Sequence, residues 1–202
     1  MLLTSCTSYE QPRSGFLSDY KKLVPGKING SYVYYNSEKS LGSYKKLLIE
    51  PVKFYFHKEA RGFYPHEMKR LSSHFHKQLL KKLGDDFEVV TQPGKDVLRI
   101  RIAITNIVPA KPALNYMSSI VTAVKGDKEP VITHFGASLA SIEGEAIDSE
   151  TQELIVAFIS SRSGGKPVGQ EIESLRWGQV RTYFDDWASL IKVRLTEAHG
   201  TD

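Results

Sequence analysis

The chain has 202 residues, 41% of them hydrophobic and 25% charged, which is enough apolar material for a folded core and too much for a disordered chain. Its formal net charge is +4, with lysines and arginines spread along the whole length. This spread argues against nucleic-acid binding, because nucleic-acid-binding domains concentrate basic residues on one face or tail. The single cysteine excludes a disulfide bond within the chain.

The position of that cysteine, Cys6, is informative. An aliphatic residue, Leu3, stands three positions before it, and the small residues Thr4 and Ser5 lie between. This pattern resembles the lipobox, in which the cysteine thiol of a bacterial lipoprotein is acylated. A signal peptide needs a basic region and an apolar stretch of about 7 to 15 residues. We therefore expect the signal region to be truncated here; the alternative is a chance cluster of small residues.

Residues 7–13 are polar and include Pro12, as expected for a short tether. We divide the chain into residues 1–13, a lipobox remnant and tether, and residues 14–202, a single domain. No stretch approaches the roughly 20 apolar residues of a membrane span, so a lipid would be the attachment.

In the first half of the domain, the patterns predict an ordered lead-in over residues 14–20, a turn at Pro25, a short strand over 31–35 and a longer strand over 44–56. Pro51 interrupts the longer strand, since proline cannot donate to a ladder. Residues 64–83 form the clearest predicted helix, with apolar side chains on one stripe.

In the second half, strands are predicted over residues 87–90 and 97–107, joined by a turn at 92–95, and a second hairpin over 137–147 and 153–161. Leu154, Val156 and Phe158 form one candidate inner face. A final amphipathic helix covers about 175–195. Together these elements predict an α+β fold with a largely antiparallel sheet covered by two helices.

Histidines offer a metal hypothesis that the helical geometry discourages. His66 and His74 point about 80° apart on the predicted helix, and His74 and His76 about 160° apart, so the three cannot reach one ion. The segment 163–166 only partly matches a phosphate loop, because Ser160 stands where the pattern needs glycine and Pro167 where it needs serine or threonine. We expect no metal and no cofactor.

Glu143 and Glu145 would share one face of a strand and could form a paired-carboxylate site for a hydrolase. The bland alternative is a solvated sheet face, which carboxylates usually occupy. We favour the solvated face.

Two segments suit binding better than catalysis. The first is the basic stripe Arg70, Lys77 and Lys81 on the first helix, which could face anionic headgroups, or could be a solvated face. The second lies within residues 113–124 and could bind a partner or pack on the sheet. Its apolar side chains are Leu114, Met117, Ile120, Val121 and Val124.

The chain resembles a family of bacterial lipoproteins known as domain-of-unknown-function family 3313. The resemblance is carried by Ser14-Gly15-Phe16-Leu17-x-Asp19-Tyr20, by the strand over residues 98–106, by Asp148-Ser149-x-Thr151 and by Phe184-Asp185-x-Trp187-Ala188. It implies export, lipid modification at Cys6 and a periplasm-facing domain, and it implies no activity. Thr7 follows the cysteine where an Asp would indicate retention at the inner membrane, so we expect the outer membrane.

The leading hypothesis is a non-enzymatic envelope lipoprotein that binds another envelope component. The alternative is a wall-active or sugar-active hydrolase using the carboxylate pair. A third reading, a cytoplasmic nucleic-acid binder, requires Met1 to be the true start.

Overall fold

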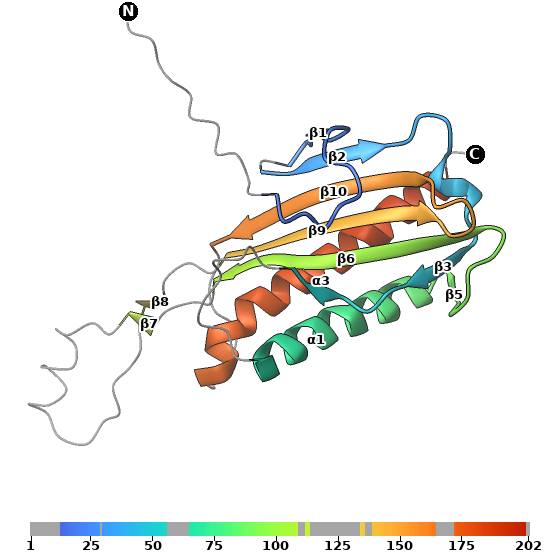
Figure 1. Cartoon of the computed structure of the whole chain (residues 1–202). Coiled ribbons are helices and arrows are strands. Elements are labelled where there is room, and N and C mark those ends of the chain that lie inside the picture. The colour runs from blue at the N-terminus through green and yellow to red at the C-terminus, as the bar shows by residue number, and fades with distance from the viewer. Residues whose placement is uncertain are drawn as a thin grey trace, which may run out of the picture.

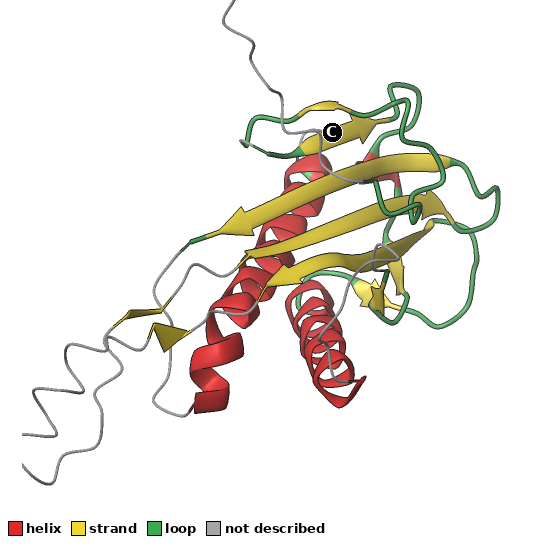
Figure 2. Cartoon of the chain, turned by 60° about the vertical axis from the view of Figure 1, so that its left-hand side comes forward, coloured by secondary structure: helices red, strands yellow, loops and turns green. Residues whose placement is uncertain are grey.

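A computed structural model describes residues 13–28, 30–55, 65–108, 112–113, 134–135, 139–164 and 172–200. Its centre is an eight-stranded sheet, and Figures 1 and 2 show two helices, α1 (Pro65–Gly84) and α3 (Ile172–His199), lying on one face of it. This is the predicted α+β fold. No helix in the described residues is long and apolar enough to cross a membrane.

The strands of the main sheet follow the order β1-β2-β10-β9-β6-β3-β5, with β4 paired to β6. Their bounds are β1 Val24–Pro25, β2 Tyr32–Tyr35, β3 Lys46–Ile49, β4 Lys53–Phe54, β5 Glu88–Val89, β6 Val97–Val108, β9 Leu139–Asp148 and β10 Leu154–Ser163. A short 3-10 helix, η1 (Leu41–Ser43), precedes β3, and β7 (Pro112–Ala113) pairs with β8 (His134–Phe135).

The sheet is mixed. The β1–β2, β2–β10, β10–β9 and β9–β6 pairs are antiparallel, whereas β3 pairs in parallel with both β5 and β6. The predicted direct hairpin between residues 87–90 and 97–107 is therefore wrong. β3 lies between β5 and β6 and pairs with both. The turn after β5 therefore connects two strands that do not pair with each other.

The other strand predictions are confirmed, except for the face on which Leu154 lies. Pro51 divides the segment over 44–56 into β3 and β4, as a missing ladder donor requires. β9 and β10 form the predicted hairpin, but a bulge between Leu154 and Val156 shifts the register. Leu154 consequently packs on the face away from the helices, while Val156 and Phe158 pack on the helix face.

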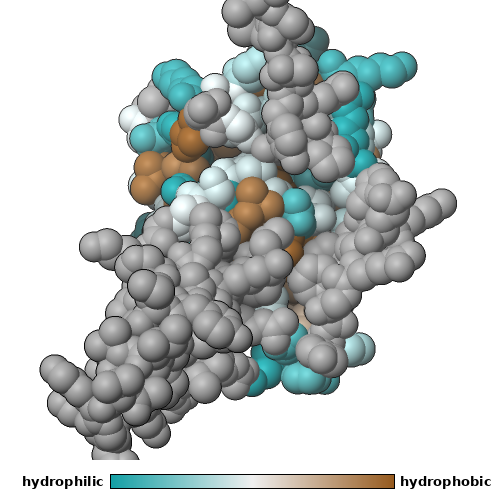
Figure 3. Space-filling model, turned by 90° about the vertical axis from the view of Figure 1, so that its left-hand side faces the viewer, coloured by the Kyte–Doolittle hydropathy of each residue, from teal (hydrophilic) through white to brown (hydrophobic). Residues whose placement is uncertain are grey.

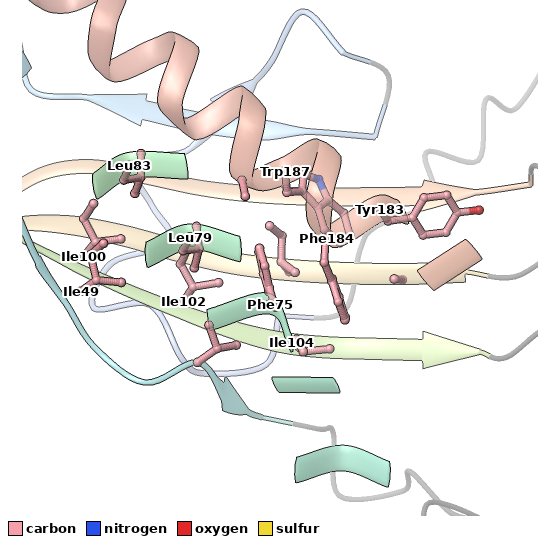
Figure 4. Close-up of a cluster of buried hydrophobic side chains, with 14 of the residues drawn as sticks. Ile49, Phe75, Leu79, Leu83, Ile100, Ile102, Ile104, Tyr183, Phe184 and Trp187 are labelled. Atoms are coloured by element: carbon pink, nitrogen blue, oxygen red, sulfur yellow. The ribbon is translucent and has the colours of Figure 1, made fainter. Parts of the chain in front are cut away.

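The helices and the sheet enclose one main core. Pro65 begins α1 and Gly84 ends it, as predicted, and α3 extends a few residues beyond both predicted ends. Phe75 of α1 stacks on Phe184 of α3, with ring centroids 4.8 Å apart and planes 8° apart. Figure 4 shows side chains of both helices meeting those of β3 and β6: Phe75, Leu79, Leu83, Phe184, Trp187, Ile49, Ile100, Ile102 and Ile104.

Candidate functional site

Two glutamates of β9 are buried on the face of the sheet that the helices do not cover. Glu143 and Glu145 are each 1% exposed. They point away from the helices because side chains alternate along β9, and the adjacent residue Ile142 faces the helices in the main core. A buried carboxylate is costly unless it is hydrogen-bonded or paired with a cation, so the partners of these two groups explain the local fold.

The partners of Glu143 come from the segment that follows the predicted tether. Ser14 donates its backbone N–H at 3.0 Å and its hydroxyl at 2.8 Å, and the Tyr20 hydroxyl also donates to Glu143. Burial, and then the hydrogen bond to Glu143, raise the pKa of the Tyr20 phenol, so Tyr20 stays a donor at neutral pH.

Glu145 has partners on two sides. Ser18 donates its backbone N–H at 2.9 Å and its hydroxyl at 3.0 Å, and Arg101 of β6 forms an ion pair with the carboxylate. The Arg101 guanidinium also lies 5.3 Å from the centre of the Phe16 ring. We call the group Ser14, Ser18, Tyr20, Glu143 and Glu145 the N-terminal clamp.

The N-terminal clamp argues against both functions that the sequence suggested for the carboxylate pair. The favoured expectation of a solvated sheet face is wrong, because residues 14–20 cover both carboxylates. The hydrolase arrangement also loses its support, because every contact of Glu143 and Glu145 named above is made to the protein itself. A substrate would have to displace residues 14–20 to reach them.

Sequence reasoning missed the clamp although it noted both halves. Two hydroxyl residues and a tyrosine spaced along residues 14–20 are donors, and Glu143 and Glu145 are alternating acceptors. Nothing in their local patterns shows that segments 123 to 129 residues apart meet.

The basic stripe on α1 lies where it was predicted. Arg70, Lys77 and Lys81 are exposed on the side of α1 away from the core. Among the histidines, His74 lies 3.2 Å from Asp185 of α3, and both ring nitrogens of His199 contact backbone carbonyl oxygens at 2.7 Å. These contacts join elements of the fold. In the described ranges, no group of three or more His, Cys, Asp or Glu side chains could hold a metal ion.

Two of the predicted sites lie outside the described residues. They are Cys6, and the apolar segment that carries Leu114, Met117, Ile120, Val121 and Val124. Both therefore stay predictions.

The structure adds a groove that the sequence did not indicate. It lies on the helix face, between the second half of α3 and strands β2 and β10, and has a volume of about 740 Å³. Val33 opposes Phe158 and Tyr35 opposes Val156 in the β2–β10 register, so these four side chains form its sheet wall. Figure 3, which views one end of the molecule, shows brown apolar surface exposed between polar patches.

Several solved structures are similar to the chain. A variant of the dodecamer PelC from Paraburkholderia phytofirmans has 13% identity and a TM-score of 0.45, covering 82% of this chain and 96% of its own. The hypothetical protein CT253 from Chlamydia trachomatis has 10% identity and a TM-score of 0.44, covering 75% of this chain and 98% of its own. A minor lipoprotein from Acinetobacter baumannii has 13% identity and a TM-score of 0.33, covering 76% of this chain and 94% of its own. Similarities at this level assign no function.

None of the curated proteins matches the chain in sequence. One family model does match, over residues 12–191, and it therefore spans the N-terminal clamp, the whole sheet and most of α3. The chain belongs to DUF3313, a family of proteins of unknown function.

Proposed function

We propose that the protein is an envelope lipoprotein, held on the outer membrane by acyl chains on Cys6, whose domain faces the periplasm and acts by binding another envelope component. Attachment and binding are separate parts of this proposal. The N-terminal clamp supports the first part, and the open groove supports the second.

The observation that carries the proposal is where the clamp takes hold of the chain. Ser14 is bonded to Glu143 through both its backbone and its hydroxyl group, so the folded domain begins at that residue. Residues 7–13 separate it from Cys6. Eight Cα-to-Cα steps span at most about 28 Å when fully extended, so a lipid on Cys6 would keep the domain beside the bilayer.

The clamp also connects the attachment point to the interior of the sheet. A pull on the tether would act on the hydrogen bonds to Glu143 and Glu145, which belong to the central strand β9. A buried, multiply bonded attachment suits a domain that must hold its position against a membrane better than a chain end that frays.

The use of the carboxylates supports binding rather than catalysis. Glu143 and Glu145 were the acidic pair that the sequence offered to a hydrolase, and the fold uses both to hold residues 14–20. The groove, by contrast, is lined mainly by apolar side chains, as binding sites for small molecules and peptides usually are.

The test of attachment is membrane fractionation of the host expressing a Cys6→Ser variant. Each buried methylene of an acyl chain contributes about 0.8 kcal/mol, so removal of the acylated thiol is expected to release the protein into the soluble periplasmic fraction. A matched control, Cys6→Ser with Ser8→Cys, restores a thiol outside the lipobox and should be released as well. Full retention of the Cys6→Ser protein in the membrane would contradict the proposal.

The choice of membrane is tested by Thr7→Asp. An acidic residue after the acylated cysteine is expected to move the protein from the outer-membrane to the inner-membrane fraction of a density gradient. Thr7→Ser, which keeps a small hydroxyl side chain, should leave the distribution unchanged. Wild-type protein found in the inner-membrane fraction would contradict the outer-membrane assignment.

A further inference from the structure

The groove beside α3 exists because two helices do not cover the whole sheet. α1 packs against α3, and α3 crosses β9, so the strands β2 and β10 extend beyond the helix layer (Figure 1). The helix face of these strands is left partly open. Val33, Val156 and Phe158 are only half-buried, and Tyr35 is 51% exposed.

The opposite wall of the groove is the second half of α3. Trp187, Ile191 and Leu195 line it, and their apolar surfaces continue into the main core. The Trp187 indole N–H donates to the Ser160 hydroxyl at 2.9 Å, so the polar group of this wall is already satisfied. The interior of the groove is therefore suited to an apolar chain that makes no hydrogen bonds.

The charged residues at the groove are mostly basic. Lys27, Lys39 and Arg194 line it, against the carboxylates of Glu145 and Glu197. Glu145 does not count toward the groove, because its carboxylate is bonded to Ser18 and Arg101 on the other face of the sheet. The charges that remain have a positive sum.

The three basic side chains differ in how far they are already paired. Lys39 lies 2.8 Å from a Glu153 oxygen, and Arg194 lies 2.8 Å from an oxygen of Glu197. Lys27 is exposed and has no ion-pair partner among the described residues. Lys27 lies in the turn before β2, whereas Lys39 follows β2 at its other end. An anionic group at the Lys27 end of the groove would therefore meet one cation that needs no rearrangement.

We propose that the groove binds a fatty-acid-like amphiphile, with its single acyl chain along the apolar walls and its anionic head group beside Lys27. The volume of about 740 Å³ falls within the range of pockets that hold small molecules, and an acyl chain matches the mainly apolar lining. The ammonium group of Lys27 gives the charge complementarity that selects an acid over a neutral chain. This proposal deepens the proposed function, because it names the ligand class of the membrane-held domain.

The test uses the full chain carrying Cys6→Ser, so that its outcome does not depend on lipid attachment. A fatty acid with a photoreactive diazirine in its acyl chain is added below its aggregation concentration, irradiated, and the labelled residues are mapped by peptide mass spectrometry. Saturable labelling of β2, β10 and the second half of α3 is expected, with palmitate competing about threefold better than the uncharged hexadecanol.

Two pairs of variants locate the site. Val33→Trp fills the groove and should weaken binding at least about tenfold, whereas Val193→Trp, on the exposed side of α3, should not. Lys27→Glu should weaken palmitate binding about threefold or more with no effect on hexadecanol, and Lys21→Glu should change neither. Lys27 is exposed, so its variant tests the proposal even where Val33→Trp does not fold.

Three results would overturn the proposal. They are labelling that does not saturate, labelling that maps away from the groove, and competition by phosphatidylglycerol vesicles but not by monomeric palmitate. The last result would indicate adsorption to a membrane surface in place of a site for a single chain.

Discussion

The two faces of β9 are equally buried and are held in different ways. Toward the helices, Ile142 is 0% exposed and packs in the main core. Toward the N-terminal segment, Glu143 and Glu145 are 1% exposed and are satisfied by hydrogen bonds and an ion pair. The apolar face accepts any side chain of suitable volume, whereas the acidic face requires donors at fixed positions. The second face therefore selects one particular segment, residues 14–20, as its cover.

The largest expected effect is on the apolar face. Phe184 is fully buried and stacks on Phe75, so Phe184→Ala removes a large side chain and leaves a cavity between the helices. We expect a loss of about 3–5 kcal/mol in the free energy of unfolding, measured by urea denaturation. Val193→Ala, at a position 48% exposed, should change it by less than about 0.5 kcal/mol. Similar losses for the two variants would contradict the assigned core.

The next effect is on the acidic face. Arg101→Leu leaves the buried Glu145 carboxylate without its cation, and we expect a loss of about 2–3 kcal/mol in urea denaturation. The double variant Arg101→Leu with Glu145→Leu should recover much of this loss, because the donors left behind belong to Ser18, which is exposed to water. Additive losses in the double variant would show that the pair is not coupled as described.

A smaller loss is expected from the clamp alone. Tyr20→Phe removes the hydrogen bond to Glu143 and the acceptor of the Gly15 backbone N–H, and we expect a loss of about 1–2 kcal/mol. Because the loss falls on the N-terminal clamp, amide hydrogen exchange of residues 14–18 should quicken while that of β6 stays slow. Asp19→Asn is a matched control within the same motif, since the one hydrogen bond of Asp19 within the described part of the chain is with the exposed N–H of Lys21. Equal exchange in both variants would argue against the clamp.

The smallest expected effect is on the pH dependence of stability, and it comes from His76 of α1, which lies on neither face of β9. Burial lowers the pKa of His76 from its usual value of 6.5, so the folded state favours the neutral ring. As the pH falls below about 6.5, His76 is protonated in the unfolded chain but stays neutral in the folded chain, so the free energy of unfolding decreases. The decrease ends once the pH is below the folded-state pKa.

Stability curves of His76→Gln between pH 7 and pH 5 should fall less steeply than those of the wild type. A His76→Gln curve as steep as that of the wild type would assign the pH dependence to other groups.

The same contrast between the faces explains what the sequence could predict. The helix stripe of Leu71, Phe75 and Leu79, and the helical cap at Gly84, are local patterns, and they located α1 within a residue at each end. The hairpin of β9 and β10 is local as well. The hairpin of β5 and β6 was wrong because the two strands are separated in the sheet by β3, which comes 39 residues or more before them in the chain.

The candidate sites depend still more on distant contacts. The alternation of Glu143 and Glu145 correctly placed both on one face, yet it could not distinguish a face covered by water from one covered by residues 14–20. The groove depends on where α3 crosses the sheet, which no local pattern reports. Cys6 is the reverse case, because its assignment rests on sequence pattern alone.

The central claim is that the domain is a lipoprotein whose clamp begins shortly after an acylated cysteine. The most direct measurement is the mass of the N-terminal peptide of the protein isolated from the membranes of its own host. A peptide that begins at Cys6 and carries the mass of acyl chains is the result we predict. A peptide that contains unmodified Cys6 preceded by Ser5 would contradict the claim, and would return the protein to the cytoplasmic reading.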